Sequence, residues 1–499
     1  MIDIIKNILT FENILMMNVG VAAGIIIGCL PGLNVIFAIA VLLPLTFGMP
    51  SIAGMYLLLG AYCGAIYGGS ISAILINTPG TPSACATVFD GYPLAQQGRA
   101  GDALKTALVA SVVGGLVSCF ALLFFAPQLA VFSIKIQAPE FFALCIFGVT
   151  AAVGIAGEQI FKGVIMALLG LLMSTVGIDT TEGTQRLMFG HIQLMAGLKV
   201  AAVMLGVFAL SEVMSKAQEV YATRRGSSAI PITFTKANIK TREILSHWKE
   251  IVMSSVFGVI IGAIPGTGGA ICAMFSYNTA KRMSKHPEQF GKGCIEGIVA
   301  PECGNNATSG ATLIPLLTLG IPGDAAVAVL IGALTMQGIT PGLHLFTQDK
   351  VWVNAIMGGL FAINILMYFQ GALFIRLFAN VTRIPMVIML PCIMILCVVG
   401  SFAINNASFD VIVTILIGFL GYVLKKCDYP IAPMTIGLVL GNLAETNLRR
   451  ALIMSNGSPL IFVTRPISFV ILLISFISLF APLVKHTFDK IRGKGGVAV

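Results

Sequence analysis

Apolar segments of about 20 residues, the length that crosses a bilayer as a helix, recur along nearly the whole of this 499-residue chain. Charged residues make up only 10% of the sequence, compared with about 25% in soluble domains. Hydrophobic residues make up 57%, compared with about 45–50%. No soluble core of this size can hide so much apolar surface. The sequence therefore predicts an all-α polytopic membrane protein, with about 10–12 transmembrane helices plus re-entrant helical hairpins.

The net charge of +9 indicates loop orientation rather than binding to nucleic acid. Basic residues collect in the cytoplasmic loops of membrane proteins, and no basic stretch here is interleaved with aromatic residues as strand-binding surfaces require. One segment, 216–249, is strongly charged, and we expect it to be a cytoplasmic linker. It separates a first membrane repeat at 1–215 from a second at 250–499.

Several short motifs occur once in each half and in the same order, which indicates an internal duplication. Two Pro-Gly breaks interrupt the apolar segments of each half. The matches are Gly24-Ile-Ile-Ile-Gly28-Cys-Leu-Pro31-Gly32 with Gly258-Val-Ile-Ile-Gly262-Ala-Ile-Pro265-Gly266, Cys63-Gly64 with Cys303-Gly304, Thr78-Pro79-Gly80 with Ile321-Pro322-Gly323, and Gln97-Gly98 with Gln337-Gly338.

Loop charges predict that the two repeats are inverted. The element at 250–280 has basic loops on both sides, so both of its ends should lie on the same membrane face. It would fold at Pro265-Gly266 into two arms of about 15 residues, each too short for a core of about 30 Å. The matching loop of the first half, 47–51, carries no charge. The basic C-terminal tail does not follow a strict inversion.

The breaks are the candidate binding elements. Unwound backbone inside a membrane must be satisfied by protein, water or ligand, and secondary transporters aim half-helix N-termini at anionic substrates there. The alternative for any single break is an ordinary kink or packing contact. The candidate substrate-binding residues are Pro31, Gly32, Pro79, Gly80, Thr81, Ser83, Pro265, Gly266, Thr267, Gly268, Pro322 and Gly323.

A second polar cluster enters the long apolar run that begins near position 300. Ionisable residues at membrane depth are rare and usually functional, and oxygen donors suit Na⁺ or a proton relay. The alternative is a hydrated helix end with capping residues. The candidate ion-coupling residues are Glu302, Asn305, Asn306, Thr308 and Ser309. Asp324 would repel an anion at its break, so we expect a helix cap or a cation ligand.

Enzyme and cofactor signatures are missing from the sequence. It contains no G-x-x-x-x-G-K-[ST] phosphate loop, no H-E-x-x-H and no G-x-S-x-G motif. We therefore expect no catalytic residues, metal or organic cofactor, and transport driven by an ion gradient or by a partner.

The chain resembles the large permease subunit (TctA-like) of the tripartite tricarboxylate transporters over essentially its whole length. The motifs that carry this resemblance are Gly28-Cys-Leu-Pro31-Gly32-Leu, Tyr67-Gly68-Gly69-Ser70-Ile71, Pro79-Gly80-Thr81-Pro82, Asp90-Gly91-Tyr92-Pro93-Leu94-Ala95, Gly262-Ala-Ile-Pro265-Gly266, Phe290-Gly291-Lys292-Gly293, Ala300-Pro301-Glu302, Asn305-Asn306 and Leu316-Leu317-Thr318-Leu319-Gly320-Ile321-Pro322-Gly323.

This resemblance implies a multi-pass protein of the bacterial inner membrane that works with a small four-helix membrane subunit and a periplasmic solute-binding protein. It implies uptake of a carboxylate, such as a tricarboxylate, with Na⁺ or H⁺ as the coupling ion. The alternative is an ion- or solute-conducting channel, which could also use mid-membrane breaks. A membrane-bound enzyme is a weaker third reading because no nucleophile–base pair or metal-ligand set is visible.

Overall fold

The computed structural model describes residues 10–30, 32–133, 136–154, 159–179, 182–222, 237–337, 339, 341–342, 345–346, 349–381 and 386–491. Most of these residues are helical, and the strands among them form the two-stranded antiparallel ribbon of β1 (Gly177–Ile178) and β2 (Gln185–Arg186). Six helical stretches in the described residues are long and apolar enough to cross a membrane, and shorter apolar helices accompany them. The expected all-α polytopic class is confirmed.

In the first half, helices alternate with breaks at the predicted positions. The elements are α2 (Phe11–Gly28), α3 (Val35–Leu42), η1 (Leu43–Thr46), α4 (Ser51–Ile76), η2 (Pro82–Ala84), α5 (Cys85–Leu94), the π-helical η3 (Ala95–Arg99), α6 (Ala100–Ser133), α7 (Ala138–Gly154), α8 (Ile160–Ser174), η5 (Ile192–Ala196), α9 (Val200–Met204), the π-helical η6 (Leu205–Leu210) and α10 (Ser211–Ala222).

The second half shows a similar order. Its elements are α11 (Thr241–Leu245), α12 (Trp248–Ala263), α13 (Gly268–Met283), η7 (Pro287–Gln289), α14 (Glu296–Ala311), α15 (Leu313–Leu319), α16 (Ala325–Met336), α18 (Lys350–Val381), α19 (Met386–Ala403), α20 (Ser408–Lys426), α21 (Ile431–Met454), α22 (Ile461–Thr464) and α23 (Pro466–Ile491). The two arms expected around Pro265-Gly266 are α12 and α13, of 16 residues each.

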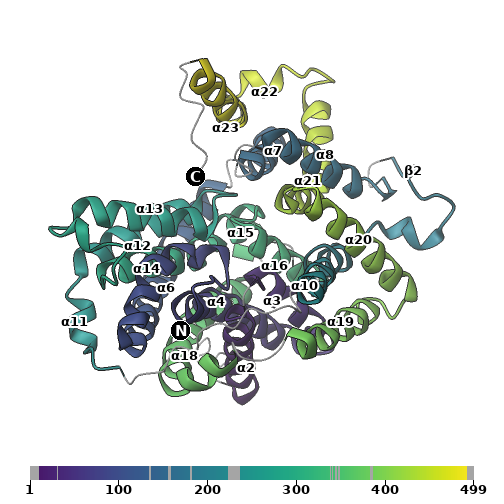
Figure 1. Cartoon of the computed structure of the whole chain (residues 1–499). Helices are drawn as coiled ribbons and strands as arrows, with labels where there is room; N and C mark the ends of the chain where they lie inside the picture. The colour runs from purple at the N-terminus through teal and green to yellow at the C-terminus, as the bar shows by residue number, and fades with distance from the viewer. Residues whose placement is uncertain are drawn as a thin grey trace.

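Helices α4 and α14 are buried helices that contact each other, and α6 lies beside both of them (Figure 1). Helix α4 is buried from Ala53 to Leu75, and α14 is buried from Gly297 to Ala311. Helix α2 packs on α4 in the same way that α12 packs on α14, while α6 packs on α14 and α18 packs on α4. Each of these two buried helices is therefore enclosed by helices of both halves.

The glycines of the repeated G-x-x-x-G motif explain these close pairs. A Cβ on Gly24 or Gly28 of α2 would overlap the backbone of α4 at Ala61 and Ala65. On α12, a Cβ on Gly262 would lie 3.0 Å from the Thr308 backbone of α14. Small residues let membrane helices approach closely, so this part of the motif serves packing rather than binding.

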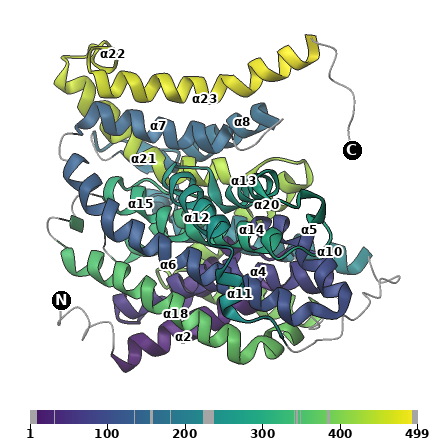
Figure 2. The ribbon, with the colours of Figure 1, turned by 90° about the vertical axis from the view of Figure 1, so that its left-hand side faces the viewer.

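The outer helices are exchanged between the halves. Helices α7 and α8 pack against α21, whereas α19 and α20 pack against α9, η6 and α10. Helix α23 packs on α7 and lies along the edge of the molecule (Figure 2). Helices also extend into the expected linker 216–249 at both ends, as α10 and as α11 with the start of α12. Its centre, 223–236, is outside the described residues.

Candidate functional site

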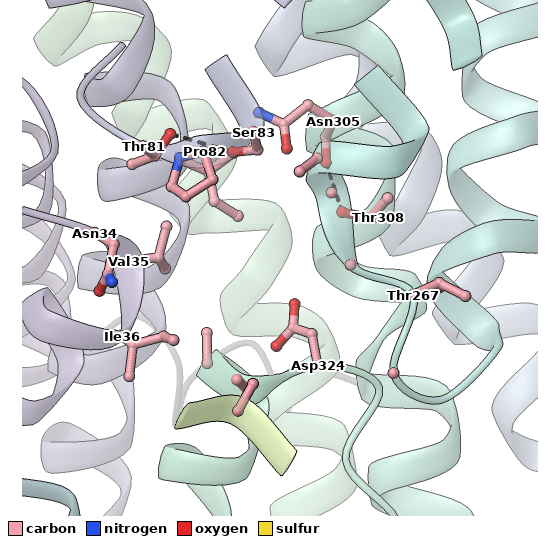
Figure 3. Close-up of a pocket in the computed structure, with 18 of the residues that line it drawn as sticks. Asn34, Val35, Ile36, Thr81, Pro82, Ser83, Thr267, Asn305, Thr308 and Asp324 are labelled. Atoms are coloured by element: carbon pink, nitrogen blue, oxygen red, sulfur yellow. Dashed lines mark hydrogen bonds between the residues drawn. The ribbon is translucent and has the colours of Figure 1, made fainter. Parts of the chain in front are cut away.

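The breaks of both halves meet at one cavity of about 220 Å³. The start of α3 and the start of η2–α5 line it from the first half, and the starts of α13 and α16 line it from the second half. Polar groups on the lining come from Asn34, Tyr62, Thr81, Ser83, Thr267, Asn305, Thr308 and Asp324, with apolar residues such as Ile66 and Ile436 between them. Figure 3 shows Thr81 and Ser83 across the cavity from Asn305 and Thr308.

Two of the four helix starts are closed by their own side chains. The Oδ1 atom of Asn34 accepts a hydrogen bond of 2.8 Å from the backbone N–H of Phe37 at the start of α3. At α16, Oδ1 of Asp324 accepts a 2.8 Å hydrogen bond from the N–H of Val327. Side-chain caps satisfy backbone donors that a helix cannot satisfy internally. The cap expected at Asp324 is present.

The other two helix starts have no side-chain cap among the described residues. Thr81 precedes η2–α5, and its hydroxyl shares a 3.2 Å hydrogen bond with the hydroxyl of Ser83. Thr267 precedes α13, and its hydroxyl donates backwards to the carbonyls of Ile261 and Ile264 instead of accepting from the helix. At η2, Pro82 has no N–H and the N–H of Ala84 donates to the carbonyl of Thr81, which leaves the N–H of Ser83 as the donor at this start. At α13 the first N–H groups follow Gly268, and the helix dipole there favours a negative ligand.

Asn305 brings a buried side-chain amide to the lining of the cavity. It is only 1% exposed, and its Nδ2 atom has no hydrogen-bond partner in the described part of the chain. A Cβ on Gly269 would overlap Oδ1 of Asn305, so the missing side chain lets the amide lie against the start of α13. A buried donor without a partner costs about 1–3 kcal/mol, and a ligand in the cavity would remove that cost.

The charge of the lining is unusual for an anion site. Asp324 is the ionisable carboxylate among the described lining residues, and no lysine or arginine is among them. Tyr62 Oη lies 3.5 Å from Oδ2 of Asp324 and 2.9 Å from the hydroxyl of Thr312. Any positive potential in the cavity must therefore come from helix dipoles and amide donors.

Some predicted substrate residues reach the cavity and others support it. Thr81, Ser83, Gly266, Thr267 and Gly268 line it. Pro31 lies outside the described residues. The remaining candidates do not line the cavity, and they are Gly32, Pro79, Gly80, Pro265, Pro322 and Gly323.

The supporting glycines hold the breaks together in pairs. A Cβ on Gly80 would overlap the carbonyl oxygen of Gly28, at the end of the first break's helix. In the second half, the N–H of Gly266 donates a 2.7 Å hydrogen bond to the carbonyl of Gly323. Gly32 lies apart, next to Nζ of Lys216. The two breaks of each half therefore touch directly.

The predicted ion-coupling residues separate into two groups. Asn305 and Thr308 line the cavity, whereas Glu302, Asn306 and Ser309 are buried behind it. Nδ2 of Asn306 donates to the carbonyl of Glu302 at 3.0 Å, and the hydroxyl of Ser309 donates to the carbonyl of Asn306 at 2.7 Å. These two contacts lie within one helix, as capping and packing contacts do.

Sequence reasoning missed several lining residues. Asn34 could have been found, because an asparagine directly before an apolar helix and after a Pro-Gly break is a helix-start signal. Tyr62 lies inside the long apolar run of α4, and Ile436 comes from α21. Nothing in their local sequence marks these two residues.

Asp90 joins the halves at the far end of this site. Its Oδ1 accepts from the N–H groups of Gly291 and Gly293 at 2.9 Å and of Cys294 at 2.8 Å, in the loop between α13 and α14. Its Oδ2 accepts from Oη of Tyr277 on α13 at 2.9 Å. One carboxylate on α5 thus fixes α13 and the start of α14.

A larger cavity of about 640 Å³ lies beside the ribbon β1–β2. Arg186 on its wall pairs with Glu445 at 2.7 Å, and the neighbouring Arg449 pairs with Asp179 at 2.7 Å. These guanidinium groups are already bound to carboxylates. The smaller cavity, where predicted residues from both halves converge, is therefore the candidate site.

The long apolar helices are typical of a multi-pass membrane protein. The chain belongs to the tripartite tricarboxylate transporter TctA family, whose model matches residues 14–436.

Two relatives come from Agrobacterium vitis. An uncharacterised 52.8 kDa protein in the TAR-I ttuC' 3' region is 37% identical over 475 residues, or 94% of each chain. An uncharacterised protein in the TAR-II ttuC' 3' region is 40% identical over 211 residues, covering 42% of this chain and 87% of the relative. No solved structure matches the chain.

Proposed function

We propose that this chain is the large permease subunit of a binding-protein-dependent secondary transporter, which imports a carboxylate with a Na⁺ or H⁺ gradient. The observation that carries this proposal is the pair of uncapped helix starts, one from each half, that face one cavity with the unpartnered amide of Asn305. In this proposal the carboxylate accepts hydrogen bonds from backbone N–H groups at both starts and from Nδ2 of Asn305.

The size and charge of the cavity support a small anion as cargo. About 220 Å³ is below the range of drug-sized ligand pockets, about 300–1,000 Å³. Helix starts stabilise a negative group without a lysine or arginine that would hold it too tightly. Asp324 would limit the net negative charge that the site accepts, which helps the cargo to leave on the other side.

The assembly and topology belong to the same proposal. The halves 1–215 and 250–499 would be inverted repeats in the bacterial inner membrane, joined by a cytoplasmic linker at 216–249. The partners would be a small four-helix membrane subunit and a periplasmic solute-binding protein, with membrane lipid around them. Interrupted helices from both halves around one site are typical of inverted-repeat transporters.

The test is uptake by the full complex in proteoliposomes, with labelled citrate and succinate as probes. We expect saturable uptake that requires the binding protein and stops when the Na⁺ and proton gradients are collapsed. Flux that persists at channel rates down the solute gradient would instead establish the channel alternative. No flux of either probe under any gradient would contradict a citrate or succinate permease.

A further inference from the structure

Glu302 on α14 is bonded by hydroxyl groups from three helices of the other half. Its Oε1 accepts from Oγ of Ser70 on α4 at 2.6 Å and from Oγ1 of Thr87 on α5. Its Oε2 accepts from Oγ of Ser111 on α6 at 2.8 Å. The side chain is 0% exposed. Within the described residues, Glu302 forms no ion pair with a lysine, arginine or histidine.

The titratable groups around Glu302 provide no positive charge. On α4, Tyr67 has a buried hydroxyl without a partner among the described residues. On α5, Asp90 is bound to the loop that ends at Cys294. On α14, Cys303 shares a 3.1 Å contact with Ser255 of α12. Lys105 of α6 donates to the carbonyl of Ile239 and not to the carboxylate.

Such a carboxylate is better suited to a proton than to a metal cation. A hydroxyl can donate to a carboxylate and can also accept from a carboxylic acid, so the same three partners serve both protonation states. An isolated charge in the interior is costly, and hydroxyl bonds offset only part of that cost. The three hydroxyl hydrogens point at the carboxylate oxygens, and a cation bound there would require the hydroxyls to turn their hydrogens away.

We propose that Glu302 binds and releases the coupling proton of transport, an inference that rests on the proposed function of the chain. In the first step, hydronium on one membrane face transfers its proton to Oε2 of Glu302 and becomes water. The carboxylic acid later returns that proton to water on the other face. The coupling ion of this permease is then H⁺.

The position of Glu302 links this proton to the cargo. Asn305, one turn further along α14, lines the cavity, and Thr87 lies on the same helix as the uncapped start near Ser83. A charged Glu302 pulls α5 and α14 together through a charge-assisted bond, and protonation weakens that bond. The two protonation states therefore favour different arrangements of the groups that would hold the carboxylate, which is what coupling requires.

The test compares Glu302→Gln with Glu140→Gln in the full complex in proteoliposomes. Glutamine keeps the shape of the protonated acid and all three hydroxyl contacts but cannot release a proton. Glu140 is also buried but pairs with Arg465 at 2.8 Å, away from the cavity, so it is the matched control. Citrate and succinate are the probes, and a pH-sensitive dye inside the vesicles reports proton entry.

We expect Glu302→Gln to reduce the substrate accumulation driven by a pH gradient at least tenfold and to abolish substrate-induced proton entry. Exchange of labelled for unlabelled substrate should continue. Glu140→Gln should keep both. Accumulation and proton entry at the unsubstituted level in Glu302→Gln would overturn the inference. Absence of substrate exchange in the unsubstituted complex would overturn the proposed function instead, and this inference with it.

Ser111→Ala gives a second measurement if Glu302→Gln fails to reach the membrane. Ser111 is the only donor to Oε2 within the described residues, so its loss disfavours the charged carboxylate and the proton is held up to a higher pH. We expect the pH of half-maximal uptake to rise by about one to two units, since a bond to a charged group is worth about 1.5–3 kcal/mol and one pH unit about 1.4 kcal/mol. An unchanged or lowered midpoint would overturn the inference.

Discussion

The four helix starts at the cavity fall into two kinds. Those of α3 and α16 are closed by Asn34 and Asp324, whereas those of η2–α5 and α13 have no side-chain cap among the described residues. Each half contributes one closed and one open start, but the two kinds follow the breaks in opposite order along the two halves. The first break is closed in the first half and open in the second half.

This difference separates two properties of the breaks, their position and their capping. Both halves provide two breaks, and each break is followed by a helix start that lines the cavity. If the proposed function holds, capping decides which starts bind the ligand, since a capped start has already used part of its donor capacity. The open starts also share a brace at their far ends, because Asp90 joins α5 to α13.

The strongest way to break the comparison is to distort an open start. Gly266 has a φ of +87°, where side chains are strained, and a Cβ there would lie 3.0 Å from the backbone of Ala151 and Ala152. We expect Gly266→Leu to abolish uptake while the protein still reaches the membrane, as measured by uptake and immunoblotting of membranes. Gly80→Leu should behave in the same way because Gly80 packs on Gly28.

Gly457 is the matched control for that experiment. Its φ is +86°, no atom lies within 4 Å of the position of a Cβ, and it is in the turn after α21. Gly457→Leu should carry the same backbone strain, about 1–2 kcal/mol, without loss of uptake. Normal uptake by both Gly266→Leu and Gly80→Leu would contradict the placement of the site at the breaks.

Removing the brace should have the next largest effect. Asp90→Ala leaves three backbone N–H groups and the hydroxyl of Tyr277 without their acceptor, at about 1–3 kcal/mol for each buried donor. We expect a large fall in the maximal uptake rate and a lower melting temperature in detergent. Asp90→Asn keeps an acceptor oxygen and should recover most of both. Full uptake by Asp90→Ala would show that the open starts need no brace.

The sequence predicted the helical class and the positions of the breaks because both are local properties. Apolar length and Pro-Gly pairs act on the residues next to them, so they can be read without knowledge of the fold. The arms on either side of Pro265-Gly266 were predicted for the same reason. The exchange of outer helices between the halves was not, because it depends on which apolar faces meet, and apolar faces in a membrane helix look alike.

The site was predicted only in part, for a related reason. Thr81 and Thr267 were predicted as site residues because they follow breaks, and both line the cavity. Gly80 was predicted for the same reason, but it packs on Gly28 instead. Whether a residue at a break faces the cavity depends on the partner helix. Glu302 and Asn305 are one turn apart and were grouped together, but their surroundings differ because different helices cover them.

The amide of Asn305 should have a moderate effect on affinity. Asn305→Leu removes the unpartnered Nδ2 donor from the cavity, and we expect the KM for uptake to rise about 10- to 100-fold, from a lost bond worth about 1.5–3 kcal/mol. Asn364 is the matched control, since it is equally buried but its Nδ2 already donates to the carbonyl of Leu360 at 2.9 Å. An unchanged KM in Asn305→Leu would remove this side chain from the site.

The closed starts offer the smallest effect, and it has the opposite sign. Asp324→Asn keeps a good N-cap for α16 but removes a negative charge from the cavity lining. We expect the KM for a carboxylate to fall about fivefold, as about 1 kcal/mol of repulsion is relieved. Asp410→Asn, at the first turn of α20 and away from the cavity, is the control. A higher KM in Asp324→Asn, with no change in Asp410→Asn, would instead make the carboxylate of Asp324 a ligand for a cation that the cargo needs. The closed and open starts would then differ in the charge of the ligand they bind rather than in capping.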